Sequence, residues 1–225
     1  RMAELWEVGQ SLAVSKDPDS ATGRQLDITC AITGTARNPE RKTVGTVTLT
    51  GDPLTLVVAG STVSIPVVGT RFGTDANATT AAVAAWVVNT AYALGDRVTN
   101  GGAPARVYQV VSPGTSALVG PGPSGTGASI VDATVTWSYV GDGTAAVDVT
   151  ITAEVAGPFA ALTGQITQID SPATGWKSVR NMADCVTGAY VETDASLRNR
   201  RLNELPGRGN GPLPAIRADL LKVGQ

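Results

Sequence analysis

The sequence predicts an α+β protein that is mainly β: a Gly/Thr/Val-rich antiparallel β-domain with an inserted small β-module, flanked by short helices at both ends. Three observations support this class. The 225 residues include 26 Gly but only 4 Trp, 4 Tyr and 2 Phe, a composition typical of short strands joined by many turns. From Val44 onward Thr and Val alternate, which is the two-residue period of strands with one buried face. Apolar residues with helical spacing gather near the two ends.

The N-terminal residues 1–37 predict two helices. The first covers residues 1–15, where apolar and small residues recur every three or four positions: Met2, Leu5, Trp6, Gly9, Leu12 and Ala13. Residues 16–20 break it. A second helix is expected from about Ala21 to Thr33, with Asp19 or Ser20 as its N-cap and Gly34 after its end. Because the chain opens at Arg1 directly in a helical pattern, we expect it to be a piece of a longer protein.

The β-domain is expected to be discontinuous, with residues 44–84 and 143–180 forming one domain around an insert. The insert, residues 85–142, differs in composition from the sequence on either side, because it has many aromatic residues between Gly/Pro-rich turns. Loop tips tolerate insertions, so we expect a small autonomous β-module there. Its aromatic residues are Trp86, Tyr92, Tyr108, Trp137 and Tyr139.

The C-terminal segment, residues 190–225, predicts two further short helices around a Gly/Pro turn. Thr193 or Asp194 can cap the first helix, whose apolar stripe consists of Leu197, Leu202 and Leu205. Pro206, Gly207 and Gly209 end it. Pro214 opens the second helix, whose stripe consists of Ile216, Leu220 and Val223.

Composition argues against several classes of partner and site. The net charge of −2 gives no reason to expect nucleic acid or acidic membranes as partners. The longest apolar run, residues 81–88, is far shorter than the roughly 18 residues of a membrane span. Cys30 and Cys185 match no metal or redox spacing, so two buried free thiols are the favoured interpretation and a disulfide is the alternative.

Candidate catalytic groups all have a simpler structural explanation. The chain has no His, so the usual triads and most zinc sites are excluded. Asp17 and Asp19 resemble the start of a calcium loop, but the following residues lack the required Gly and Glu. Glu192 and Asp194 flank a helix start, where negative charge suits the helix dipole. We therefore expect no enzyme, no cofactor, and no catalytic, cofactor-binding or metal-ligating residues.

A basic cluster near the C-terminus raises the hypothesis of a nucleic-acid-binding surface. Residues 176–225 hold eight Lys/Arg against five Asp/Glu, which is a local net charge of only +3 without interleaved aromatic residues. We expect instead an exposed helix face that forms ion pairs with a partner subunit. The cluster consists of Arg198, Arg200, Arg201 and Arg208.

Several runs, in order along the chain, resemble the baseplate J-like wedge proteins of contractile phage tails. They are ELWEVGQSLAVSKDPDSATGRQLDITCAITGTAR (4–37), GTVTLTG (45–51), GWKSVRNMADCVTGAYVETD (175–194), and ETDASLRNRR followed by AIRADLLKV. The resemblance implies a virion structural protein of the tail baseplate, or of a related contractile injection system, assembled in the bacterial cytoplasm. It also implies contacts with other wedge subunits and with a second copy of the chain. For these contacts we expect the terminal helix faces, namely Leu5, Trp6, Leu12, Leu197, Arg201, Leu205, Ile216 and Leu220; the alternative is that these stripes pack within the chain.

The insert resembles small chitin-binding-type carbohydrate modules. The resemblance lies in the pattern AW-x5-Y-x2-GD-x-V that begins at Ala85, followed by VYQV and VTWSYVG. It implies an alternative function, a surface module that contacts host glycans during adsorption through Trp86, Tyr92, Tyr108, Trp137 and Tyr139. The competing explanation is that a module of this size needs its aromatic residues to fill its core.

Overall fold

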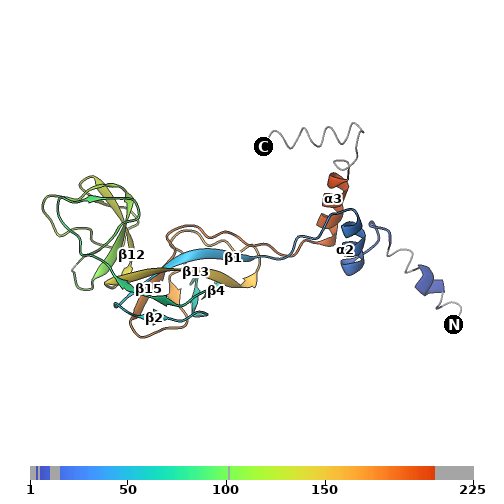
Figure 1. Ribbon diagram of the computed structural model, residues 1–225, viewed down its shortest axis with the longest axis horizontal. Helices are drawn as coiled ribbons and strands as arrows, with labels where there is room; N and C mark the ends of the chain where they lie inside the picture. The colour runs from blue at the N-terminus through green and yellow to red at the C-terminus, as the bar shows by residue number, and fades with distance from the viewer. Residues whose placement is uncertain (1–3, 5, 11–15, 101, 206–225) are drawn as a thin grey trace. The chain divides into compact units, whose positions relative to one another are not determined.

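The computed structural model describes residues 4, 6–10, 16–100 and 102–205. It is 37% strand and 14% helix, and every pair of named strands is antiparallel, so the expected mainly β class is confirmed. The chain divides into two compact units, which we call the helical unit (Arg1–Arg41 and Tyr190–Gln225) and the β unit (Lys42–Ala189). The helical unit is therefore built from two segments that the whole β unit separates in the sequence (Figure 1).

The β unit contains two larger sheets and two small ones. Its strands are β1 (Lys42–Gly51), β2 (Leu56–Val57), β3 (Thr62–Ser64), β4 (Arg71–Thr74), β5 (Ala78–Thr79), β6 (Ala81–Ala82), β7 (Ala91–Tyr92), β8 (Arg97–Asn100), β9 (Arg106–Ser112), β10 (Gly114–Thr115), β11 (Ile130–Asp132), β12 (Val135–Asp142), β13 (Ala145–Ala156), β14 (Gln168–Ile169) and β15 (Trp176–Arg180).

The main sheet has the order β14-β3-β4-β13-β1-β15, and β6 also pairs with β13. Its centre is the long pair β1–β13, in which Val47 lies opposite Val149. Alternate residues of these strands point into one apolar core, where Leu49, Phe72 and Ile151 are fully buried. Residues 44–51 and 145–156, far apart in the sequence, thus share one sheet.

The insert forms the second sheet, with the order β11-β12-β9-β8, beside the small pair β10–β7. Its own core contains Tyr108 and Trp137 together with three valines, Val98, Val110 and Val135. All six of these strands lie between residues 91 and 142.

The insert is joined to the main sheet by more than its two chain connections. A small apolar cluster contains Val107 and Val140 from the insert together with Ala146 from β13. Gly141 is required at this junction, because a Cβ there would lie 2.2 Å from the Thr50 hydroxyl oxygen. The two sheets therefore share packed side chains, and the insert is not connected by flexible loops alone.

The described helices are α2 (Gly23–Ile32) and α3 (Asp194–Glu204), and residues 6–10 are also helical. Thr193 caps α3 by accepting a hydrogen bond from the Ser196 N–H, as predicted. The expected cap of α2 is wrong: Thr22 occupies the N-cap position without a capping bond. Instead the Gly23 N–H donates to the carboxylate of Asp194 at 2.9 Å, so a distant residue replaces the local cap. The second predicted C-terminal helix lies outside the described residues.

Candidate functional site

The described residues of the helical unit form one small apolar cluster between α2 and α3. It consists of Ala21, Leu26, Cys30 and Leu197. Leu197 is fully buried, so its expected role as a partner contact is wrong, and the alternative that this stripe packs within the chain holds for it. Cys30 and Cys185 are both free and buried, which confirms the favoured interpretation of the two thiols.

Arg37 links three parts of the helical unit. Its Nε donates to Asp27 of α2 at 2.6 Å, its Nη2 donates to Asp194 of α3 at 2.6 Å, and its Nη1 donates to the Glu192 carbonyl oxygen. The Gly23 N–H and the Arg37 guanidinium hold the pKa of Asp194 below its usual range. Asp194 is therefore an ionised structural group that ties the start of both helices to residue 37.

Arg200 forms a second centre of the same kind. It donates to Glu192 through Nε at 3.0 Å and through Nη2 at 2.7 Å, and to Glu204 through Nη1 at 3.1 Å. Glu192 is nearly buried and also accepts from the Asn38 N–H. Its bonds with Arg200 lower its pKa to about 2, so it is ionised throughout the neutral range.

The other arginines of α3 are also used inside the unit. Arg198 donates to the carbonyl oxygens of Pro18 and Ala21 at 2.9 and 2.7 Å, and Arg201 donates to the Thr33 hydroxyl at 3.3 Å. Arg198, Arg200 and Arg201 therefore all have hydrogen-bond acceptors within the described chain, and their expected ion pairs with a partner subunit stay a prediction. Residues 18–36, distant in sequence, supply carbonyl and hydroxyl acceptors to these arginines, whereas the carboxylates that bind Arg200 come from Glu192 and Glu204. Arg208 lies outside the described residues.

Of the other residues expected at interfaces, Trp6 is 70% exposed and Leu205 is half-buried. Leu5, Leu12, Ile216 and Leu220 lie outside the described residues. Sequence reasoning missed Ile28 and Ile32, which are 48% and 81% exposed on α2. Their i, i+4 spacing was the available signal, since it places both on the face opposite Leu26 and Cys30.

The aromatic residues of the insert mostly build its interior. Trp137 and Tyr108 are only 0% and 1% exposed, so their expected contact with a glycan is wrong and the core-filling alternative holds. The Tyr92 ring packs edge-on against Trp137 at 4.9 Å between centroids, and Trp86 is half-buried against the same cluster. A Cβ at Gly122 would lie 2.7 Å from the Trp86 ring, so the 120–125 loop covers one face of it.

Polar groups of these rings are satisfied inside the insert. The carboxylate of Asp132 accepts from the indole N–H groups of Trp86 and Trp137 at 2.8 and 3.3 Å, and from the Ala117 N–H at 3.0 Å. Tyr139 donates to Asp142 at 2.9 Å, and burial together with this bond raises its pKa to about 12. Sequence reasoning did not anticipate Asp132, because its role arises only when three distant segments meet.

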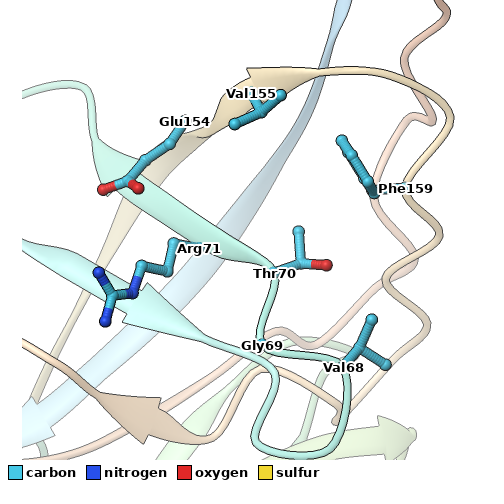
Figure 2. A pocket seen from close by; sticks show the side chains of 7 residues that line it. All are labelled: Val68, Gly69, Thr70, Arg71, Glu154, Val155 and Phe159. Carbon is cyan, nitrogen blue, oxygen red and sulfur yellow. The ribbon is translucent and has the colours of Figure 1, made fainter.

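The β unit also has an open hollow of about 290 Å³ where the main sheet splays apart. Strand β13 runs on to Ala156, but it pairs with β4 only as far as Ala153. Figure 2 shows Arg71 and Glu154 at one end of the hollow and apolar side chains at the other. The apolar end is formed by Val68, Val155 and Phe159. The hollow can hold one apolar side chain or small ring, and none of the residues predicted from sequence lines it.

Within the described residues, no three metal-binding side chains gather at one place, and no helix has the length and apolar content to cross a membrane. No family model matches the chain, and no curated protein matches it either.

Proposed function

We propose that the chain is a structural subunit of a phage or phage-tail-like baseplate wedge, which acts through protein–protein interfaces in tail assembly and contraction. The resemblance of the ordered runs from residue 4 to residue 223 is the starting point of this proposal. The structural observation that supports it is the set of hydrogen bonds made by the run ETDASLRNRR, residues 192–201. Its charged side chains join residues 18–38 to α3 within one unit, which is a structural role that suits a scaffold protein.

The state of the carboxylates supports a role without catalysis. A general acid must hold a proton at working pH, and a general base must be free to accept one. The Glu192 carboxylate has a pKa of about 2 and is bound by Arg200. Asp194 is bound by Arg37 and by the Gly23 N–H. These carboxylates are better suited to holding the helices together than to transferring protons.

The proposed neighbours are other wedge subunits and a second copy of the chain, in the tail baseplate of the particle. Among the residues expected at these contacts, Trp6 keeps a largely exposed ring in the described structure. Exposed aromatic side chains are frequent anchors of protein interfaces.

The proposal is tested by immunogold electron microscopy of particles from the source of the chain, with an antibody raised against it. Label confined to the baseplate end of the particle is the expected result. Label on the head, along the tail tube or on no particle would overturn the proposal. Preimmune serum is the control.

The alternative, a glycan-binding insert, has less support from the geometry, because Trp137 and Tyr108 are buried and one face of Trp86 is covered. Passing the whole chain over chitin and peptidoglycan tests it. We expect the chain to elute with a non-binding control protein. Retention that Trp86→Ala abolishes, with folding intact by circular dichroism, would favour the glycan-binding function.

A further inference from the structure

Helix α2 presents an apolar face that no described residue of its unit covers. Ile28 and Ile32 are 48% and 81% exposed and lie one turn apart. The opposite face of the helix, with Leu26 and Cys30, packs against Leu197. Two exposed isoleucines on one face leave apolar surface in water, and covering that surface would stabilise the unit.

The size of the helical unit adds to this argument. Helices α2 and α3 have 10 and 11 residues, and helices shorter than about 12–15 residues are marginal without tertiary packing. Four buried side chains supply that packing among the described residues. A further element on the Ile28/Ile32 face would give α2 apolar contacts on both sides.

The position of the end of α3 indicates which segment of the chain can reach the Ile28/Ile32 face of α2. Near the end of α3, the Arg201 Nε donates to the Thr33 hydroxyl at 3.3 Å, and the Thr35 hydroxyl donates to Glu204 at 2.8 Å. The C-terminal end of α3 therefore lies beside the C-terminal end of α2.

The following segment has the composition of a connector and then an amphipathic helix. Residues 206–213 are rich in Gly and Pro, and eight residues span at most on the order of 25 Å, which is ample for a turn back onto α2. After them, Ile216, Leu220 and Val223 recur at i, i+4 and i+7, which is one stripe of a helix.

We propose that residues 214–223 pack as a third helix on α2, with Ile216 and Leu220 against Ile28 and Ile32. The occupant of the apolar face is thus the chain's own C-terminal segment. This assigns Ile216 and Leu220 to a contact within the helical unit in place of a contact with a neighbouring subunit. The inference is independent of the proposed function.

Disulfide trapping in the full chain tests the contact. Ile32→Cys combined with Leu220→Cys should cross-link within one chain under mild oxidation, at a rate that does not depend on protein concentration. Peptide mass spectrometry identifies the linked pair. The matched control is Val67→Cys with Leu220→Cys, because Val67 is 95% exposed in the β unit. We expect the control to cross-link at least tenfold more slowly.

Two results would overturn the proposal. Cross-links that join two chains and increase with concentration would assign the face to a second copy. A rate equal to that of the control would mean that the segment does not dock on α2.

A second measurement does not depend on introduced cysteines. In Leu220→Asp, the amides of Ile28–Ile32 should exchange hydrogen at least tenfold faster than in the unmodified chain. Ala218→Asp, on the opposite side of the predicted helix, should leave their exchange within twofold. Equal exchange in both variants would contradict the proposed contact.

Discussion

The helical unit and the β unit are stabilised in opposite ways. The β unit has an extended apolar core in which side chains such as Leu49, Phe72 and Ile151 are completely buried. Among the described residues of the helical unit, four apolar side chains form a buried cluster, and Arg37 and Arg200 connect the segments through charged hydrogen bonds. Apolar burial does not depend on protonation, whereas an Arg–carboxylate contact does. The two units should therefore respond differently to cavities, to pH and to charge removal.

The largest expected effect is a cavity in the β unit. Phe72→Ala removes a fully buried ring and should lower the free energy of unfolding by about 3–5 kcal/mol. Urea unfolding followed by tryptophan fluorescence measures this, because Trp176 is buried in the same core. Val67→Ala, at an exposed hairpin residue, should stay within about 0.5 kcal/mol. A loss below about 1 kcal/mol for Phe72→Ala would show that this core does not dominate.

A smaller effect is expected in the helical unit from Glu192→Gln. The amide cannot replace an ionised acceptor for Arg200, and bonds to charged groups contribute about 1.5–3 kcal/mol. Amide hydrogen exchange should become faster in α2 and α3 and remain unchanged in β1 and β13. Glu154→Gln, an exposed carboxylate, is the control. Faster exchange in the main sheet would contradict the separation between the two units.

The pH dependence of the stability of the helical unit provides a second way to distinguish it from the β unit. The pKa of Glu192 is lowered from 4.5 to about 2 in the folded chain, so its contribution is complete above pH 4.5 and is lost as the pH falls toward 2. Helical-unit protection, measured by pulsed hydrogen exchange, should decline across this window. In Glu192→Gln the decline should be shallower. An unchanged profile in the variant would exclude Glu192 as its cause.

The smallest effect is expected where the insert meets the main sheet. Arg97 of β8 donates to Asp148 of β13 at 2.7 Å, but half of the Asp148 side chain is exposed. Arg97→Gln should therefore cost only about 0.2–1 kcal/mol. Urea unfolding at low and high salt measures it, and the difference should shrink at high salt. A loss as large as that of Phe72→Ala would mean that the junction controls the stability of the β unit.

Local patterns were sufficient to predict much of the fold. The Thr/Val alternation predicted strands from Val44 and again over residues 145–169, because alternating side chains are an intrinsic property of a strand; the structure has β1 at Lys42–Gly51, and within 145–169 it has β13 at Ala145–Ala156 and β14 at Gln168–Ile169. Of the two residues predicted as possible caps of α3, Thr193 and Asp194, Thr193 is the cap, and its partner Ser196 is only three positions away. The same local reasoning failed for α2, whose first N–H is satisfied by Asp194, 171 residues away.

Which charged and aromatic side chains remain available to a partner was decided by the tertiary structure. The α3 arginines have the residue types and spacing of an exposed basic face, and the return of residues 17–38 beside α3 supplies acceptors for them inside the unit. Trp137 and Tyr108 fit a ligand-binding pattern, yet the pairing of β9 with β12 places both in the core. The strand period and the Thr193 cap of α3 depend on neighbours in the sequence, so the sequence alone determined them. Burial and ion pairing depend on contacts between distant segments, which exist only once the chain has folded.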